Sequence, residues 1–270
     1  MREWIMESAV AEYLRDQKDL LPSLYDWKFD DAHAAKLFGI SFAGQDWFQK
    51  TLELKEDLRS RVRSTACAAV HGDVATYFIK KWGGITRFSK VSETLELFAQ
   101  YQGQKLMPLD FKPSFERISS WSKWASIVCP EWACIYDARV AYSLNAINYL
   151  NGGGHPIFPM PEGRNTRLQM LDITTLLLQE RLQTGELSDP KSLRKRHYLP
   201  DRDVYVRYLE LTRDVSMKLW NDTAHIHEVE MLLFSLADGQ VYQDVFDRTA
   251  RKKAPQRNAY CHDLASTVPA

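Results

Sequence analysis

The sequence has few residues that break regular structure. Glycine and proline number 12 and 11 in 270 residues, and they gather at a few places. Long segments between those places contain neither residue, which favours extended helices. No convincing segment of alternating apolar and polar residues occurs, and no Asn-Gly pair joins two such segments. These absences exclude an all-β architecture, and the sequence predicts an all-α fold.

Cysteine is also scarce. The four cysteines are Cys67, Cys129, Cys134 and Cys261, with no CxxC pair and no zinc-site spacing to histidine. We expect Cys129 and Cys134 to be buried thiols, because they lie in an apolar stretch. The sequence therefore predicts neither a metal nor another cofactor. A reducing compartment fits.

Long apolar runs and a charge excess are missing as well. No run approaches the roughly 20 apolar residues that a membrane span needs. The N-terminus does not have the pattern of a signal peptide. We therefore expect a monomeric, cytoplasmic protein with no membrane partner. Lys plus Arg and Asp plus Glu are both 35. Zero net charge removes the simplest argument for a nucleic-acid partner, although charge can still segregate on the surface.

The apolar periodicity predicts one helical domain over residues 1–250, with a polar tail at 251–270. Two lobes around a cleft, meeting near residues 102–113, are compatible with the pattern. Ser92 has the residue type of a helix N-cap. Asn151-Gly152-Gly153-Gly154 ends a helix and opens the longest irregular loop, residues 151–163. Helices are expected at residues 4–21, two or three within 45–80, 93–101, 114–129, 137–150, 168–183, 203–220 and 226–237.

Two residues in the stretch 114–150 have the chemistry of a catalytic pair. Asp137 stands where a helix begins, so it can cap that helix or, as an ionised carboxylate, stabilise a developing cation or activate a water. Lys123 lies on the preceding helix. Nearby tryptophans can exclude water from its amine, which lowers a lysine pKa and favours nucleophilic chemistry. A solvated lysine and a simple N-cap are the structural alternatives.

This stretch resembles the helix-hairpin-helix DNA glycosylases, especially their 8-oxoguanine glycosylase-like branch. Ser122-Lys123-Trp124-Ala125 is similar to the lysine element of that family, and Tyr136-Asp137-Ala138-Arg139-Val140 to its aspartate element. The resemblance covers about 40 residues. Ser120-Trp121-Ser122 stands where the family has Gly-x-Gly, and the lysine-to-aspartate spacing is shorter than usual.

The resemblance implies a role for each residue. The target base of double-stranded DNA would be flipped into a pocket. Asp137 would stabilise the oxocarbenium-like sugar, and Lys123 would attack C1′ if the enzyme is also an AP lyase. Ser120, Ser122 and Arg139 would contact the DNA backbone. The expected base pocket consists of aromatic residues: Trp121, Trp124, Trp132 and Tyr136.

Further candidates come from the residues alone. Arg164, Asn165 and Arg167 end the Gly/Pro-rich loop and could hold a phosphate, or could cap a helix and remain solvated. His225, His227, Glu228 and Glu230 resemble metal ligands at first sight. The His225-x-His227 spacing does not place both imidazoles on one helix face, so no metal is expected.

Three functions remain open at this point. The first is a DNA glycosylase (a hydrolase acting in base excision) on a modified or damaged base, with antiviral defence against phages that modify their DNA as a hypothesis. The second is an N-glycosidase acting on a nucleoside or RNA. The third is a non-catalytic nucleic-acid-binding module in which Asp137 is only a helix cap.

Overall fold

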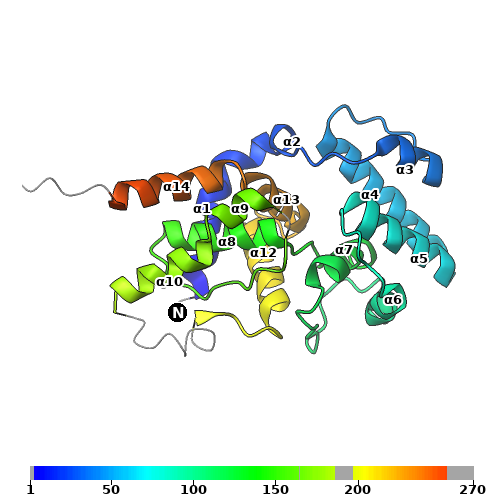
Figure 1. Ribbon diagram of the computed structural model, residues 1–270. Coiled ribbons are helices and arrows are strands. Elements are labelled where there is room, and N and C mark those ends of the chain that lie inside the picture. The colour runs from blue at the N-terminus through cyan, green and yellow to red at the C-terminus, as the bar shows by residue number, and fades with distance from the viewer. Residues whose placement is uncertain (1–2, 164, 186–196, 254–270) are drawn as a thin grey trace, which may run out of the picture.

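The computed structural model describes residues 3–163, 165–185 and 197–253, and they form an all-helical fold (Figure 1). Within these residues, extended backbone pairs only at an isolated parallel bridge between Ile157 and Tyr198. The all-α prediction is confirmed. Among the described helices, none combines the length and apolar character that crossing a bilayer requires.

The helices fall into two groups that lie side by side (Figure 1). In the left-hand group, α8 packs on α1, α10, α13 and α14, and in the right-hand group α7 packs on α4, α6 and η2. The left-hand group contains α1 (Glu3–Leu14), the 3-10 helix η1 (Arg15–Leu20), α2 (Leu21–Leu24), α8 (Ala138–Leu150), α9 (Thr166–Met170), α10 (Ile173–Gln183), α12 (Val204–Trp220), α13 (Ile226–Leu236) and α14 (Gln240–Lys253). The right-hand group contains α3 (Asp31–Phe38), α4 (Trp47–Ser64), α5 (Ala68–Thr76), the π-helix η2 (Tyr77–Trp82), α6 (Val91–Ala99) and α7 (Ile118–Val128).

The chain crosses between the groups at residues 25–30 and 129–137, whereas residues 102–113 connect α6 to α7 inside the right-hand group. We call the contact zone between the groups the seam. The indole Nε1 of Trp27 donates to Trp82 O across it, at 3.0 Å. Trp27 also packs edge-on against Phe234 of α13. The first crossing segment is thus fixed to both groups by one aromatic side chain.

Most of the expected helices are present, with some corrections. Lys90, not Ser92, is the N-cap of α6, so the predicted cap is wrong. The expected helix at 168–183 is two helices, because Asp172 accepts hydrogen bonds from Thr174 N and Thr175 N and starts α10 anew. The sequence analysis missed α14. It also missed α3, although Asp30 caps the start of that helix and Gly39 ends it with a positive φ of 67°.

The irregular loop at 151–163 is held by the helix before it. Asn145 of α8 donates its amide to Phe158 O (2.8 Å) and accepts from Phe158 N (2.9 Å). Asn148, also on α8, makes the same pair of bonds to His155 O and N. Buried Arg181 donates to Gly153 O. Buried side chains therefore satisfy the loop backbone at His155 and Phe158, while Ile157 between them pairs with the backbone of residues 197–199.

The cysteines behave as expected where the structure describes them. Cys129 and Cys134 are buried free thiols, and Cys67 is an exposed one. Burial raises the pKa of Cys129 and of Cys134 to about 12, so both stay protonated at neutral pH. Cys261 lies outside the described residues.

Candidate functional site

Asp137 is the N-cap of α8, which confirms the expectation that it starts this helix. Its Oδ1 accepts from Arg139 N (3.0 Å) and Val140 N (3.1 Å). Among the described residues, Oδ2 has no hydrogen-bond partner. The side chain is partly exposed. One oxygen thus caps the helix, and the other remains available to a ligand.

Side chains from other helices hold the backbone that leads into Asp137. Tyr205 and Tyr208 of α12 donate their hydroxyls to Cys134 O (2.8 Å) and Ile135 O (2.7 Å). The Oγ of Ser122 on α7 accepts from Tyr136 N at 3.1 Å. These bonds replace the helix or sheet bonds that an extended segment lacks. They fix the position of Asp137 relative to α7 and α12.

Lys123 is buried on α7, with 5% of its surface exposed. Its Nζ donates to Ser119 O, one turn earlier on the same helix, at 2.9 Å. Its stem passes over Gly83, where an added Cβ would lie 2.5 Å from Lys123 Cε. Burial lowers the pKa of Lys123, and the negative charges of Asp137 and Glu230 oppose that shift. The amine is therefore desolvated, which is one of the two alternatives that the sequence left open.

Lys123 and Asp137 interact electrostatically without touching. The carboxylate of Asp137 is the largest influence that raises the Lys123 pKa against the effect of burial. In the described part of the chain, no ion pair within 4 Å joins the two side chains. They therefore lie in the same region of the seam.

Two charged residues that the sequence analysis did not place here also lie at the seam. Lys55 of α4 and Glu230 of α13 have side chains only 1% and 4% exposed, and Lys55 Nζ is 3.7 Å from Glu230 Oε2. The same Glu230 oxygen accepts from Ile135 N at 3.4 Å. Lys55 Nζ also lies 5.8 Å from the centre of the Trp82 ring. The only signal in the sequence was that each of these two charged residues occupies a position on the apolar face of its helix.

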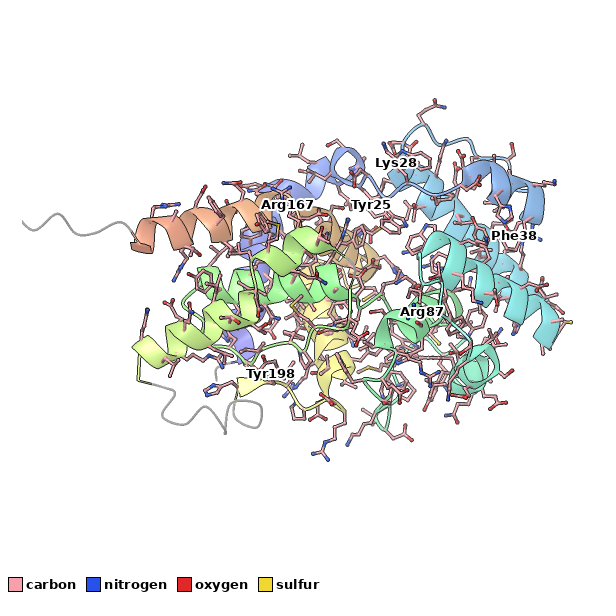
Figure 2. The ribbon with its side chains drawn as sticks, viewed as in Figure 1. Tyr25, Lys28, Phe38, Arg87, Arg167 and Tyr198 are labelled. Atoms are coloured by element: carbon pink, nitrogen blue, oxygen red, sulfur yellow. The ribbon has the colours of Figure 1, made fainter. Side chains whose placement is uncertain are left out.

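Tyr25 belongs to the same region. It stands at the start of the first crossing segment (Figure 2). Burial raises its pKa, and the negative charges of Glu230 and Asp137 raise it further. The phenol is therefore neutral, and it presents a polar hydroxyl among the seam charges.

Arg139 and Asn165, two of the residues that the sequence proposed for contacts with DNA, share a protein partner in the structure, and their contact with DNA stays a prediction. Arg139 Nη2 and Asn165 Nδ2 both bind Asp238 Oδ2, each at 2.9 Å. The Arg139 guanidinium also lies over the ring of Phe234, 4.6 Å from its centre. Asn165 caps α9. The guanidinium of Arg167 lies over the ring of Tyr242, and its backbone N–H donates to Asn165 Oδ1. Arg164 lies outside the described residues.

The remaining candidates face inward. The predicted pocket aromatics Trp121, Trp124, Trp132 and Tyr136 are all buried. Trp121 Nε1 donates to Ser114 O and Glu116 O, Trp132 Nε1 to Gln104 O, and Tyr136 Oη to Pro159 O. Ser120 and Ser122 are buried too. In this conformation these side chains support α7 and the second crossing segment, and their contact with DNA stays a prediction.

A large groove lies elsewhere. A cavity of about 1060 Å³ lies between α1, α12 and residues 154–158, and neither Asp137 nor Lys123 lines it. Because the seam chemistry and this groove share no residue, groove size does not locate the candidate site. No group of three or more potential metal ligands occurs within the described ranges.

Comparison with protein-family models, with curated proteins and with solved structures gives no match for this chain.

Proposed function

We propose that this protein is a DNA glycosylase-like enzyme that cleaves the N-glycosidic bond of a modified or damaged base in duplex DNA. The proposal joins the sequence resemblance over residues 114–150 to the arrangement of the seam. A cytoplasmic location, a monomeric state and a role in defence against phages with modified DNA are parts of the same proposal.

The observation that carries the proposal is the free oxygen of Asp137. A helix N-terminus favours an ionised carboxylate, because the unpaired backbone N–H groups and the helix dipole stabilise negative charge. Oδ1 makes the two capping bonds. Among the described residues, Oδ2 has no hydrogen-bond partner, so it can interact with a ligand. A fixed anion suits a reaction in which positive charge develops on a sugar ring.

The proposed reaction uses water. The bond between the base nitrogen and C1′ breaks, and water adds its hydroxyl to C1′. Asp137 would stabilise the cationic sugar and accept the proton of the attacking water, and transfer of that proton to the base nitrogen would let the base leave in its neutral form. Lys123 would position the sugar or the phosphate beside it, because its amine is held at Ser119 O.

The experiment is base release from genomic DNAs that carry different base modifications, followed by alkali to reveal abasic sites. Asp137→Asn keeps the shape and removes the charge. We expect base release to fall about 10²- to 10³-fold, as when one preorganised stabilising group is lost, while the far-UV circular dichroism stays helical.

Asp172→Asn is the matched control. Asp172 caps α10 through Oδ1 with the same two-bond geometry, but its Oδ2 is occupied by the Thr175 hydroxyl at 2.7 Å. The control should cost helix stability and leave base release unchanged. Equal release by Asp137→Asn and the wild type would show that the chemistry lies elsewhere.

The burial of Ser120 and Ser122 favours the second candidate, an N-glycosidase acting on a nucleoside or RNA. Hydroxyls engaged inside the protein do not contact a duplex backbone, and the chain has no net positive charge. Free modified nucleosides and RNA belong in the same assay. Release from these substrates but not from duplex DNA would favour this alternative.

A further inference from the structure

The charges of the seam are divided between the two helix groups. Lys55 on α4 and Lys123 on α7 come from the right-hand group. Asp137 at the start of α8 and Glu230 on α13 come from the left-hand group. The two lysines and Glu230 are nearly inaccessible to water. Two cations thus meet two anions where the groups touch.

The buried ammonium of Lys55 lacks hydrogen-bond partners. Its ammonium has three donors, and among the described residues Nζ makes no hydrogen bond. The carboxylate of Glu230, 3.7 Å away, is its ion-pair partner. Trp82 Nε1 beside it is another buried donor without a partner in the described part of the chain. Unpaired buried polar groups lower stability and therefore call for an explanation other than stability.

Glu230 connects this pair to the candidate site. Its Oε2 accepts the N–H of Ile135, two residues before Asp137. A glutamine could accept that bond equally well, so the bond alone does not explain a charged residue. The charge acts on two amines: it raises the pKa of Lys55 and of Lys123 against burial, the dominant effect on each.

We infer that Glu230 is a positioning residue of the candidate site: its carboxylate pairs with buried Lys55 across the seam and accepts the N–H of Ile135, which holds the backbone leading to Asp137. The same negative charge opposes the lowering of the Lys123 pKa by burial, so its removal should make Lys123 titrate at lower pH. This inference deepens the proposed function and rests on it for the activity measurement alone.

Other titratable groups face the same carboxylate. Lys55 lowers the pKa of Glu230 and Lys123 lowers it less, whereas burial, the largest effect, and Asp137 raise it. The negative charge of Glu230 also tends to raise the pKa of the other titratable groups around it. These are Tyr25, Cys134, Tyr205, Tyr208 and Arg59. The groups that act on Lys123 from outside α7 are Asp137, Glu230 and Lys55.

The test is an NMR titration of the lysine side chains in the full chain, with the Lys123 signal assigned from its loss in Lys123→Gln. Glu230→Gln removes an anion that favours the charged amine, so Lys123 should titrate at lower pH than in the wild type. Glu228→Gln is the matched control on the same helix, because Glu228 is 30% exposed and pairs with His225. It should leave the Lys123 titration unchanged.

A second variant protects the test against misfolding. Glu230→Gln alone leaves Lys55 buried without a counterion, whereas Glu230→Gln with Lys55→Met removes both charges and should fold at least as well as the wild type. In the double variant, Lys123 should still titrate at lower pH, but by a smaller amount, because a repelling cation is lost as well.

The pH profile of base release gives the second readout. The limb of the pH profile that depends on the titration of Lys123 should move to lower pH in Glu230→Gln. The same limb should stay in place in Glu228→Gln. An unmoved Lys123 titration in Glu230→Gln, or an equal movement in Glu228→Gln, would overturn the inference. If no base release occurs in any protein, the proposed function fails, and the titration still decides the role of Glu230.

Discussion

Buried polar groups near the two ends of α8 differ in how completely they are hydrogen-bonded. Towards the C-terminal end, Asn145 and Asn148 each use both amide atoms to satisfy one loop residue. At the N-terminal end, the buried amine of Lys55 makes no hydrogen bond within the described residues. Asp137, which is partly exposed there, uses one carboxylate oxygen for its two capping bonds. Satisfied polar networks specify a shape. Groups left unsatisfied lower stability, and such groups gather at functional sites.

The comparison therefore predicts two classes of variant. Changes in the loop network should reduce stability and leave the chemistry of folded molecules intact. Changes in the seam that leave no buried charge unpaired should alter chemistry or its pH dependence with little loss of stability.

The largest effect on stability is expected for Asn145→Ala. This change leaves both backbone groups of Phe158 without partners in the interior, at about 1–3 kcal/mol for each buried group. We expect the free energy of unfolding in urea to fall by about 2–5 kcal/mol. Asn151→Ala is the control, because Asn151 is exposed and donates only to Ile147 O. An equally large loss of stability in Asn151→Ala would mean that the network around Phe158 contributes no more to stability than an exposed side-chain hydrogen bond.

A smaller effect is expected for Lys123→Gln. Its amine is bound to Ser119 O and its stem packs on Gly83, so we expect a positioning role and no covalent intermediate. Base release should fall about tenfold to a hundredfold, as for a misplaced reacting group, and borohydride should not trap wild-type protein on DNA. Trapping that is lost in Lys123→Gln but kept in Lys112→Gln would instead identify Lys123 as the nucleophile of a bifunctional enzyme.

The smallest effect concerns His227, which also faces the seam from α13. Burial, and then the positive charges of Arg59 and Lys55, lower the pKa of His227 well below 6.5. The folded protein therefore keeps a neutral imidazole where the unfolded chain takes up a proton. Stability should fall as the pH drops below about 6.5, with a slope of up to about 1.4 kcal/mol per pH unit from this group.

His227→Gln should weaken this dependence, measured as the free energy of unfolding in urea at pH 7 and pH 5.5. His225→Gln is the control, since His225 is 36% exposed and pairs with Glu228. If His227→Gln and the wild type lose the same stability over this interval, His227 is not a source of the acid sensitivity.

The helical class and the start of α8 follow from the sequence alone. Long segments without glycine or proline favour helix, in which residues close in the chain satisfy the backbone hydrogen bonds. Asp137 has a side chain that accepts hydrogen bonds from the free N–H groups at a helix N-terminus. Both properties depend on residues close together in the chain. The same reasoning failed at α6, where Ser92 has the right residue type but Lys90 occupies the cap position.

Only the tertiary structure decided which charged side chains meet. Lys55 and Glu230 are 175 positions apart, and the only local sign that they are buried is the apolar position that each occupies in its own helix. Their ion pair exists because α4 and α13 pack across the seam. Long-range packing also turned Ser122 inward to Tyr136 and gave Glu230 the N–H of Ile135. Periodicity identifies the apolar face of one helix, but the partner of that face depends on how the whole chain folds.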